Sequence, residues 1–278
     1  MIRLTVTFPA IQEAKALMPL GLSTPHSAPH AFDIKGARMS TVTCPTTGQV
    51  IAVATPEADL IEIGHTFGLG GGPYPDLIFK SRDSRYTRAA TDLSHDATRI
   101  AREAGGGRAG MQAILNHTAT QFDYGHPDER FYEPHDHVPQ LCGLTEGSCV
   151  DINIYLLAAL RSAGYEAGYI TGYFVPDEKR TWCNDSHCWV VTRLDGVIEE
   201  WDIAHCLKLG RRDVTPGLNP KPGVRVAMAH SMGWTLPELG LVDQKLMGPP
   251  GWLLPDGRLV EAEDQQIRLE GYEVLAAA

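Results

Sequence analysis

GSCVDINIYLLAALRSAG, residues 147–164, carries the strongest structural signal in this chain. Its apolar residues recur with helical spacing after Asp151 and stop at Gly164, a residue type that commonly ends helices. Ser148 is a favoured N-cap, and Asp151 three residues later completes a shortened capping box. The pattern therefore predicts a helix of about four turns that places Cys149 in its first turn.

The predicted position of Cys149 suits nucleophilic chemistry. A helix N-terminus carries about half a positive charge, which favours the thiolate over the thiol. The amide of a first-turn residue has no helical partner, so it is free to donate to a developing oxyanion. A lone cysteine at a helix start is more often a small core residue. The catalytic interpretation therefore depends on a base elsewhere in the chain.

A β-hairpin downstream supplies a candidate base. The residue pattern predicts two strands, at 167–174 and 187–194. Asp195-Gly196 is a typical two-residue hairpin turn, and a return strand is predicted at 197–203. In the register that this turn imposes, His187 is the diagonal neighbour of Asp202. That separation lets the carboxylate hold one imidazole nitrogen while the other points away. A surface histidine and a solvated acid are the alternatives for these two residues.

In this chain a cysteine opens a helix, a histidine opens a strand and an aspartate lies on the next strand. This order resembles that of the catalytic residues in the transglutaminase-like superfamily. The local sequences are similar to that family in Phe122-Asp123-Tyr124, 147–149, 160–165, 167–173, 186–190 and 201–205. The resemblance extends over about residues 90–207. It implies a papain-like α+β fold, in which the nucleophile helix packs on an antiparallel sheet, and a catalytic triad of Cys149, His187 and Asp202.

The resemblance also implies an acyl-transfer enzyme that works through a thioester and needs no cofactor. The superfamily includes transamidases, proteases and amidases, as well as members without catalysis. We expect hydrolysis of an amide bond in a peptide or small amide, with transamidation and a non-catalytic binding module as alternatives. Four residues are candidates for the second oxyanion donor or for substrate contacts: Tyr124, Gln140, Ser148 and Trp189.

The remaining segments predict a chain in three parts. Short alternating runs indicate a small N-terminal β unit over 1–75. The catalytic core is expected over 76–210, with helices at 92–104 and 108–122, and a C-terminal extension packed on the core over 211–278. The glycine-rich residues 68–73 lack the Lys-Ser/Thr of a phosphate loop, so a connector is predicted there.

Charge and cysteine usage narrow the partners and the compartment. The 278 residues carry a net charge of −10 with scattered Lys and Arg, which argues against nucleic acid as a partner. No stretch resembles a secretion signal or a membrane span, so we expect no membrane partner. Six cysteines without an export signal favour free thiols in the cytoplasm.

No metal is expected. His126, His135 and His137 cluster in the sequence, and Cys183 and Cys188 flank the candidate base. Neither set has the spacing of a zinc site, such as CxxC pairs or HExxH. Cys188 points to the face of its strand opposite His187, and a structural role is predicted for it.

Overall fold

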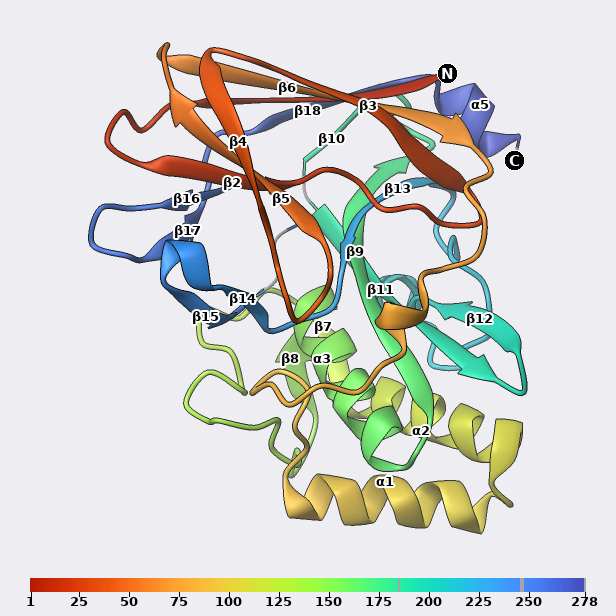
Figure 1. Cartoon of the computed structure of the whole chain (residues 1–278). Helices are drawn as coiled ribbons and strands as arrows, with labels where there is room; N and C mark the ends of the chain where they lie inside the picture. Colours follow the sequence, from red (N-terminus) through yellow and green to blue (C-terminus); the bar gives the residue numbers. More distant parts are fainter. Residues whose placement is uncertain (185, 246–247, 278) are drawn as a thin grey trace.

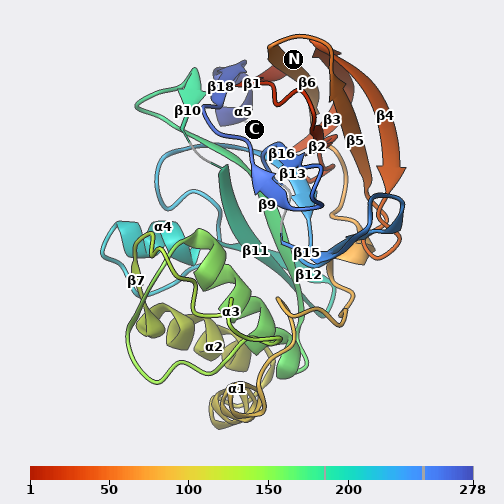
Figure 2. The same ribbon diagram turned by 90° about the vertical axis from the view of Figure 1, so that its left-hand side faces the viewer.

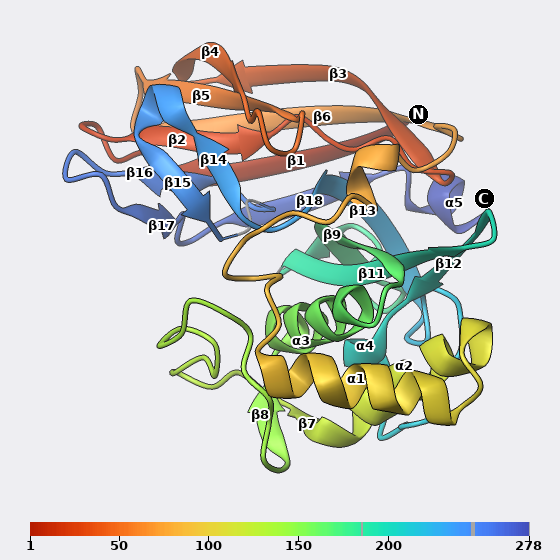
Figure 3. The same ribbon diagram turned by 60° about the horizontal axis from the view of Figure 1, so that its bottom comes forward.

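The computed structural model of the chain describes residues 1–184, 186–245 and 248–277, so one residue of the predicted catalytic core and three of the predicted C-terminal extension lie outside it. Three layers follow one another in Figures 1 and 3: strands from both ends of the chain, an antiparallel core sheet, and helices. The two termini lie close together because the first strand, β1, pairs with the last, β18.

The core sheet and one helix form the predicted α+β core. The sheet has the order β12 (Val197–Trp201), β11 (Ser186–Leu194), β9 (Glu166–Pro176) and β13 (Gly223–His230), with every pair antiparallel. Helix α3 (Cys149–Ser162) packs on β9 and β11, and its other side meets α1 (Thr91–Glu103) and α2 (Gly107–Gln121) (Figure 2). This position between two layers explains why α3 is apolar almost all round. The prediction of a helix that begins at Cys149 and packs on an antiparallel sheet is confirmed.

The β layer consists of two five-stranded sheets that combine the two ends of the chain. One has the order β10 (Trp182–Cys183), β18 (Gln266–Glu270), β1 (Ile2–Pro9), β6 (Leu60–Leu69) and β3 (Ser27–Lys35). The other has the order β17 (Leu259–Glu261), β16 (Gly251–Leu253), β2 (Lys15–Pro19), β5 (Val50–Pro56) and β4 (Ala37–Thr43). Segments after residue 211 thus supply one strand of the core sheet and three strands of the β layer.

Short elements complete the chain and include two paired strands beside α3. They are η1 (Asp76–Ile78), β7 (Phe122–Tyr124), β8 (Thr145–Gly147), α4 (Ile203–Lys208), β14 (Trp234–Leu236), η2 (Pro237–Leu239), β15 (Leu241–Gln244) and α5 (Tyr272–Ala276). Strands β7 and β8 are parallel, and β8 leads directly into the start of α3. In the described part of the chain, no helix has the length and apolar character that crossing a membrane requires.

The predicted hairpin is present, but its return strand ends early. Leu194 pairs with Val197, and both turn residues have positive φ angles, 51° at Asp195 and 80° at Gly196. Strand β12 stops at Trp201, so the prediction of a strand through residue 203 is wrong at its end. The cause is Asp202, whose Oδ1 accepts a hydrogen bond of 3.0 Å from the backbone N–H of His205 and so begins α4 as an N-cap.

The pairing of β13 with β9 generates a stability prediction. Gly172 lies between Ala227 of β13 and His187 of β11, and a Cβ atom at Gly172 would stand 2.0 Å from the carbonyl oxygen of Val226. We expect Gly172→Ala to lower the free energy of unfolding by about 1–3 kcal/mol, because backbone must move to admit the methyl group. Unfolding in urea measures this change in the free energy of unfolding.

The matched control is Gly68→Ala in β6, where a Cβ atom would meet nothing within 4 Å. It should unfold at nearly the same urea concentration as the unaltered protein. Equal stability of the two variants would show that β13 does not approach β9 as closely as described.

Candidate active site

The first turn of α3 is held by a buried capping arrangement. The backbone N–H of Ser148 donates to Oδ2 of Asp151 at 2.8 Å, and Nη1 of Arg130 donates to the Ser148 hydroxyl oxygen at 2.9 Å. Arg130 also forms an ion pair with the fully buried Asp151. The predicted capping box is confirmed, and Cys149 is the first residue of the helix, 8% exposed.

The side chains of Cys188 and His187 lie near enough to the Cys149 thiol to shift its pKa. The hydrogen bond with Cys188, followed by the hydrogen bond and positive charge of His187, holds the pKa of Cys149 well below its ordinary value despite burial. Burial alone would lower the pKa of His187, but the Asp202 carboxylate and the Cys149 thiolate outweigh burial and raise it. A depressed thiol pKa beside a raised imidazole pKa favours a thiolate–imidazolium pair.

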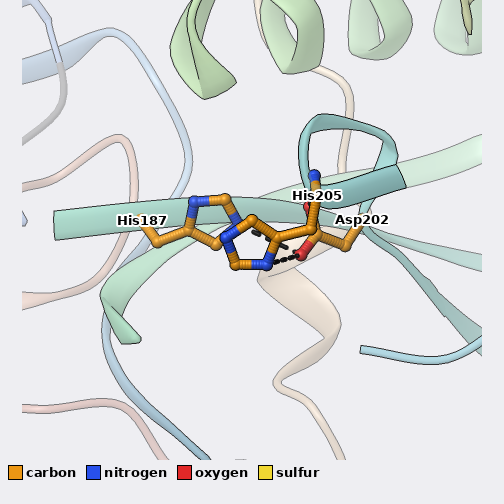
Figure 4. Close-up of side chains that lie close together, drawn as sticks. All are labelled: His187, Asp202 and His205. Carbon is orange, nitrogen blue, oxygen red and sulfur yellow. Dashed lines mark hydrogen bonds and ion pairs between the residues drawn. The ribbon is translucent and has the colours of Figure 1, made fainter. Parts of the chain in front are cut away.

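The predicted contact between His187 and Asp202 is present. Nε2 of His187 lies 3.1 Å from Oδ2 of Asp202, and both side chains are buried (Figure 4). Because Nε2 is engaged by the carboxylate, Nδ1 is the nitrogen left for the thiol of Cys149. The carboxylate comes from the cap of α4 and not from the return strand that the sequence suggested.

Two further residues share the same carboxylate oxygen. Nδ1 of His205 lies 2.8 Å from Oδ2 of Asp202, and Nη2 of Arg225, from β13, also contacts that oxygen. The His205 ring stacks on the His187 ring at a centroid distance of 4.0 Å and an interplanar angle of 6° (Figure 4). Burial raises the pKa of Asp202, but the positive charges of His187 and Arg225 overcome it and hold that pKa well below the ordinary value.

His205 and Arg225 are not among the residues predicted from the sequence for this site. The spacing of Asp202 and His205, three residues apart across a helix start, is a local signal that was available. Burial lowers the pKa of His205 to about 4, so this ring is neutral at pH 7. Arg225 lies 23 residues beyond Asp202, and its contact arises only because β13 joins the core sheet.

The cluster does not suit a metal ion, although His187, Asp202 and His205 are the one group of three potential ligands close enough together among the described residues. The Arg225 guanidinium contacts the oxygen that a cation would need, and the two imidazole rings lie parallel. The two cysteines weighed for zinc belong to different hydrophobic clusters: Cys183 packs beside β1 and Cys188 beside α3.

The four candidate oxyanion or substrate residues lie in different places. Ser148 caps α3 next to Cys149, and Tyr124 is paired with Gly147 across β7 and β8. The Gln140 side-chain oxygen accepts a hydrogen bond from the Tyr155 hydroxyl at 3.4 Å, well along α3. Trp189 is 1% exposed, and the guanidinium of Arg225 lies 5.1 Å from its ring centroid. Ser148 and Tyr124 are therefore the members nearest in the chain or sheet to Cys149.

A cavity of about 260 Å³ opens beside the first turn of α3. Its lining includes Val150 and Ser186, the sequence neighbours of Cys149 and His187. Arg130 and Lys245 contribute positive charge to the wall, and Glu261 contributes negative charge. This cavity is the candidate entry for a substrate, because its lining includes the chain neighbours of both Cys149 and His187.

Comparison with solved structures gives a fold likeness over nearly the whole chain. A candidate cysteine protease from Cytophaga hutchinsonii matches with a TM-score of 0.56 and 12% identity, covering 97% of this chain and 89% of that one. The periplasmic domain of TgpA from Pseudomonas aeruginosa, bound to ethylmercury, matches with a TM-score of 0.40 and 14% identity, covering 76% of this chain and 92% of that one. No curated protein matches the sequence.

The family comparison covers the segment that contains the site. Residues 94–201 match the model of the transglutaminase-like superfamily, from α1 to the last residue of β12. The superfamily consists typically of cysteine-dependent enzymes, and Cys149 and His187 both fall within the matched range. The part of the chain that carries α1, α2, α3, β9, β11 and β12 is thus similar to the transglutaminase-like superfamily.

Proposed function

We propose that the protein is a cysteine-dependent acyl-transfer enzyme that hydrolyses an amide bond through a thioester. One observation carries the proposal: a thiol at a helix N-terminus contacts an imidazole whose other nitrogen is held by a buried carboxylate. Cys149 is the proposed nucleophile, His187 the acid and base, and Asp202 the residue that orients His187.

The proposed reaction begins with attack of the Cys149 thiolate on the amide carbonyl carbon. The first-turn amide of α3 supports the oxyanion, since it has no helical partner. The imidazolium of His187 then gives its proton to the leaving amine, which departs and leaves a thioester on Cys149. Neutral His187 next takes a proton from water, the hydroxide attacks the thioester, and the thiolate leaves as the acid is released.

The cavities beside the site favour a peptide over a small amide as substrate. The cavity at α3 adjoins a second of about 320 Å³, which adjoins a third of about 650 Å³. Successive cavities share lining residues, first Ser186, Pro249 and Glu261, then Asn184, Gln265 and Ile267. An extended chain of several residues would fill this series, whereas a small amide would occupy its first member only.

Transamidation is the second candidate, because an amine could replace water at the thioester. The segment 125–144, between β7 and β8, precedes the cysteine, and all its residues except Tyr132 and Val138 are partly or fully exposed. A dedicated transferase needs a channel that keeps water from the thioester, and a wet loop at this position does not provide one. Hydrolysis is therefore proposed first. A binding module without catalysis would have no need of the thiolate–imidazolium pair.

Trapping the acyl-enzyme tests the proposal directly. After exposure to a library of peptides and small amides, intact-mass spectrometry should detect a protein adduct that proteolytic mapping assigns to Cys149. Cys149→Ala should form no adduct and show no turnover while melting at nearly the same temperature, because the change removes one sulfur at a helix start. Turnover by Cys149→Ala would exclude this residue as the nucleophile.

Asp202→Asn tests the orienting role and its charge. We expect turnover to fall by up to about four orders of magnitude, since an amide at this position selects the wrong imidazole tautomer. Loss of the carboxylate charge should also lower the pKa of His187 and raise the pKa of Cys149. The pH above which iodoacetamide alkylates Cys149 rapidly should therefore rise.

Near-normal turnover of Asp202→Asn would contradict the orienting role. Asp195→Asn, in the exposed hairpin turn, is the matched control for the same chemical change, and it should leave turnover and the alkylation profile unchanged.

Added amines separate hydrolysis from transamidation. With a substrate found by adduct trapping, primary amines at millimolar concentration should leave the acid as the main product, because water competes freely for the thioester. Quantifying acid and amide products by chromatography and mass spectrometry measures the partition. An amide yield that dominates and saturates with amine concentration would reveal a bound acceptor and establish the transamidase alternative.

A further inference from the structure

Cys188 lies beside Cys149 and forms no covalent bond in the proposed amide chemistry. As predicted, the pleat of β11 turns its side chain away from the His187 face, but the face to which it points carries α3. Asn153 on α3 donates from Nδ2 to the carbonyl oxygen of Cys188 at 3.0 Å and to its sulfur at 3.4 Å.

The position of Asn153 brings the two sulfurs together. Residues four apart share one face of a helix, and Asn153 follows Cys149 by four. The sulfur that Asn153 contacts therefore lies over the helix face to which Cys149 belongs, and each thiol is near enough to shift the pKa of the other. Both are buried, with Cys149 8% and Cys188 1% exposed.

We propose that Cys149 and Cys188 form a peroxide-sensitive thiol pair, in which oxidation of Cys149 is resolved by Cys188 to an intramolecular disulfide. The pair is a modification site within the core, and its ligand class is a hydroperoxide. The disulfide would occupy the proposed nucleophile and could be opened again by a dithiol, so it would switch the site off reversibly. This oxidation can take place whether or not the protein cleaves amides.

The reaction balances in two steps. The Cys149 thiolate attacks one oxygen of hydrogen peroxide, the O–O bond breaks, and hydroxide leaves and takes a proton, which yields a sulfenic acid and water. The Cys188 sulfur then attacks the sulfenic sulfur, the S–O bond breaks, and the Cys188 proton goes to the departing hydroxide. The sum is two thiols and one peroxide giving one disulfide and two waters.

The electrostatics of the pair set the order of these steps. Burial and the neighbouring Cys149 thiolate raise the pKa of Cys188 well above its ordinary value, so Cys188 stays a thiol while Cys149 is an anion. Oxidation of Cys149 removes that anion and its repulsion, which frees Cys188 to ionise and attack. Disulfide formation would bring these two neighbouring sulfurs to about 2.05 Å.

Intact-mass spectrometry of the reduced protein after treatment with hydrogen peroxide is the test. The unaltered protein should lose about 2 Da per disulfide, with tryptic mapping linking Cys149 to Cys188, and dithiothreitol should restore the original mass. Cys188→Ser should instead gain about 32 Da as a sulfinic acid at Cys149, which dithiothreitol does not remove. Cys149→Ser should leave Cys188 reduced at the same peroxide concentration.

Cys142→Ser is the matched control, because this exposed cysteine lies outside the pair; it should behave like the unaltered protein. Cys188→Ala is a second variant for the same test, used if Cys188→Ser folds poorly. Peptide mapping of the unaltered protein tests for the Cys149–Cys188 disulfide without any variant. A gain of about 32 Da at Cys149 with no linked peptide would overturn the proposal. If dithiothreitol fully restored the original mass of peroxide-treated Cys188→Ser, that result would also overturn the proposal.

Discussion

The buried carboxylate of Asp202 is the charge on which both the fold and the candidate site depend. An ion removed from water costs several kcal/mol unless partners replace its hydration. Here one oxygen meets His187, His205 and Arg225, while the other accepts the first backbone N–H bond of α4. These partners come from β11, α4 and β13, so the carboxylate is satisfied only when all three segments are in place. The candidate site and the fold therefore depend on each other.

The side chains around Asp202 also determine which of its neighbours carry a positive charge. Arg225 is a permanent cation, and His205, whose pKa burial lowers to about 4, is neutral at pH 7. His187 is thus the histidine of the cluster whose protonated form is stabilised, between the Asp202 carboxylate and the Cys149 thiolate. A neutral ring stacked on His187 restricts its orientation without adding a competing charge. Such an arrangement suits a group that must accept and return one proton.

The β layer supports the site through β13. Val224, Val226 and Met228 of this strand belong to the same hydrophobic cluster as residues of β1 and β18. Arg225, between two of these apolar residues, points to the other face of the sheet and meets Asp202. Packing of the chain ends therefore holds the strand that delivers the guanidinium. The terminal strands contribute to the electrostatics of the core as well as to its stability.

The residues of α3 and the β11–β12 hairpin could be predicted from sequence because their signals are local. A capping box, an apolar helical period and an Asp-Gly turn each act within a few residues, and they sufficed to bring Cys149, His187 and Asp202 into consideration. The early end of β12 is also a local effect, because the Asp202 carboxylate accepts a hydrogen bond from the first turn of α4 and the strand ends at Trp201. Arg225, the pairing of β18 with β1 and the contact between Cys149 and Cys188 had no such signal. They depend on which distant strands pair and which sheet face receives a helix, and burial of apolar surface across the whole chain makes that choice.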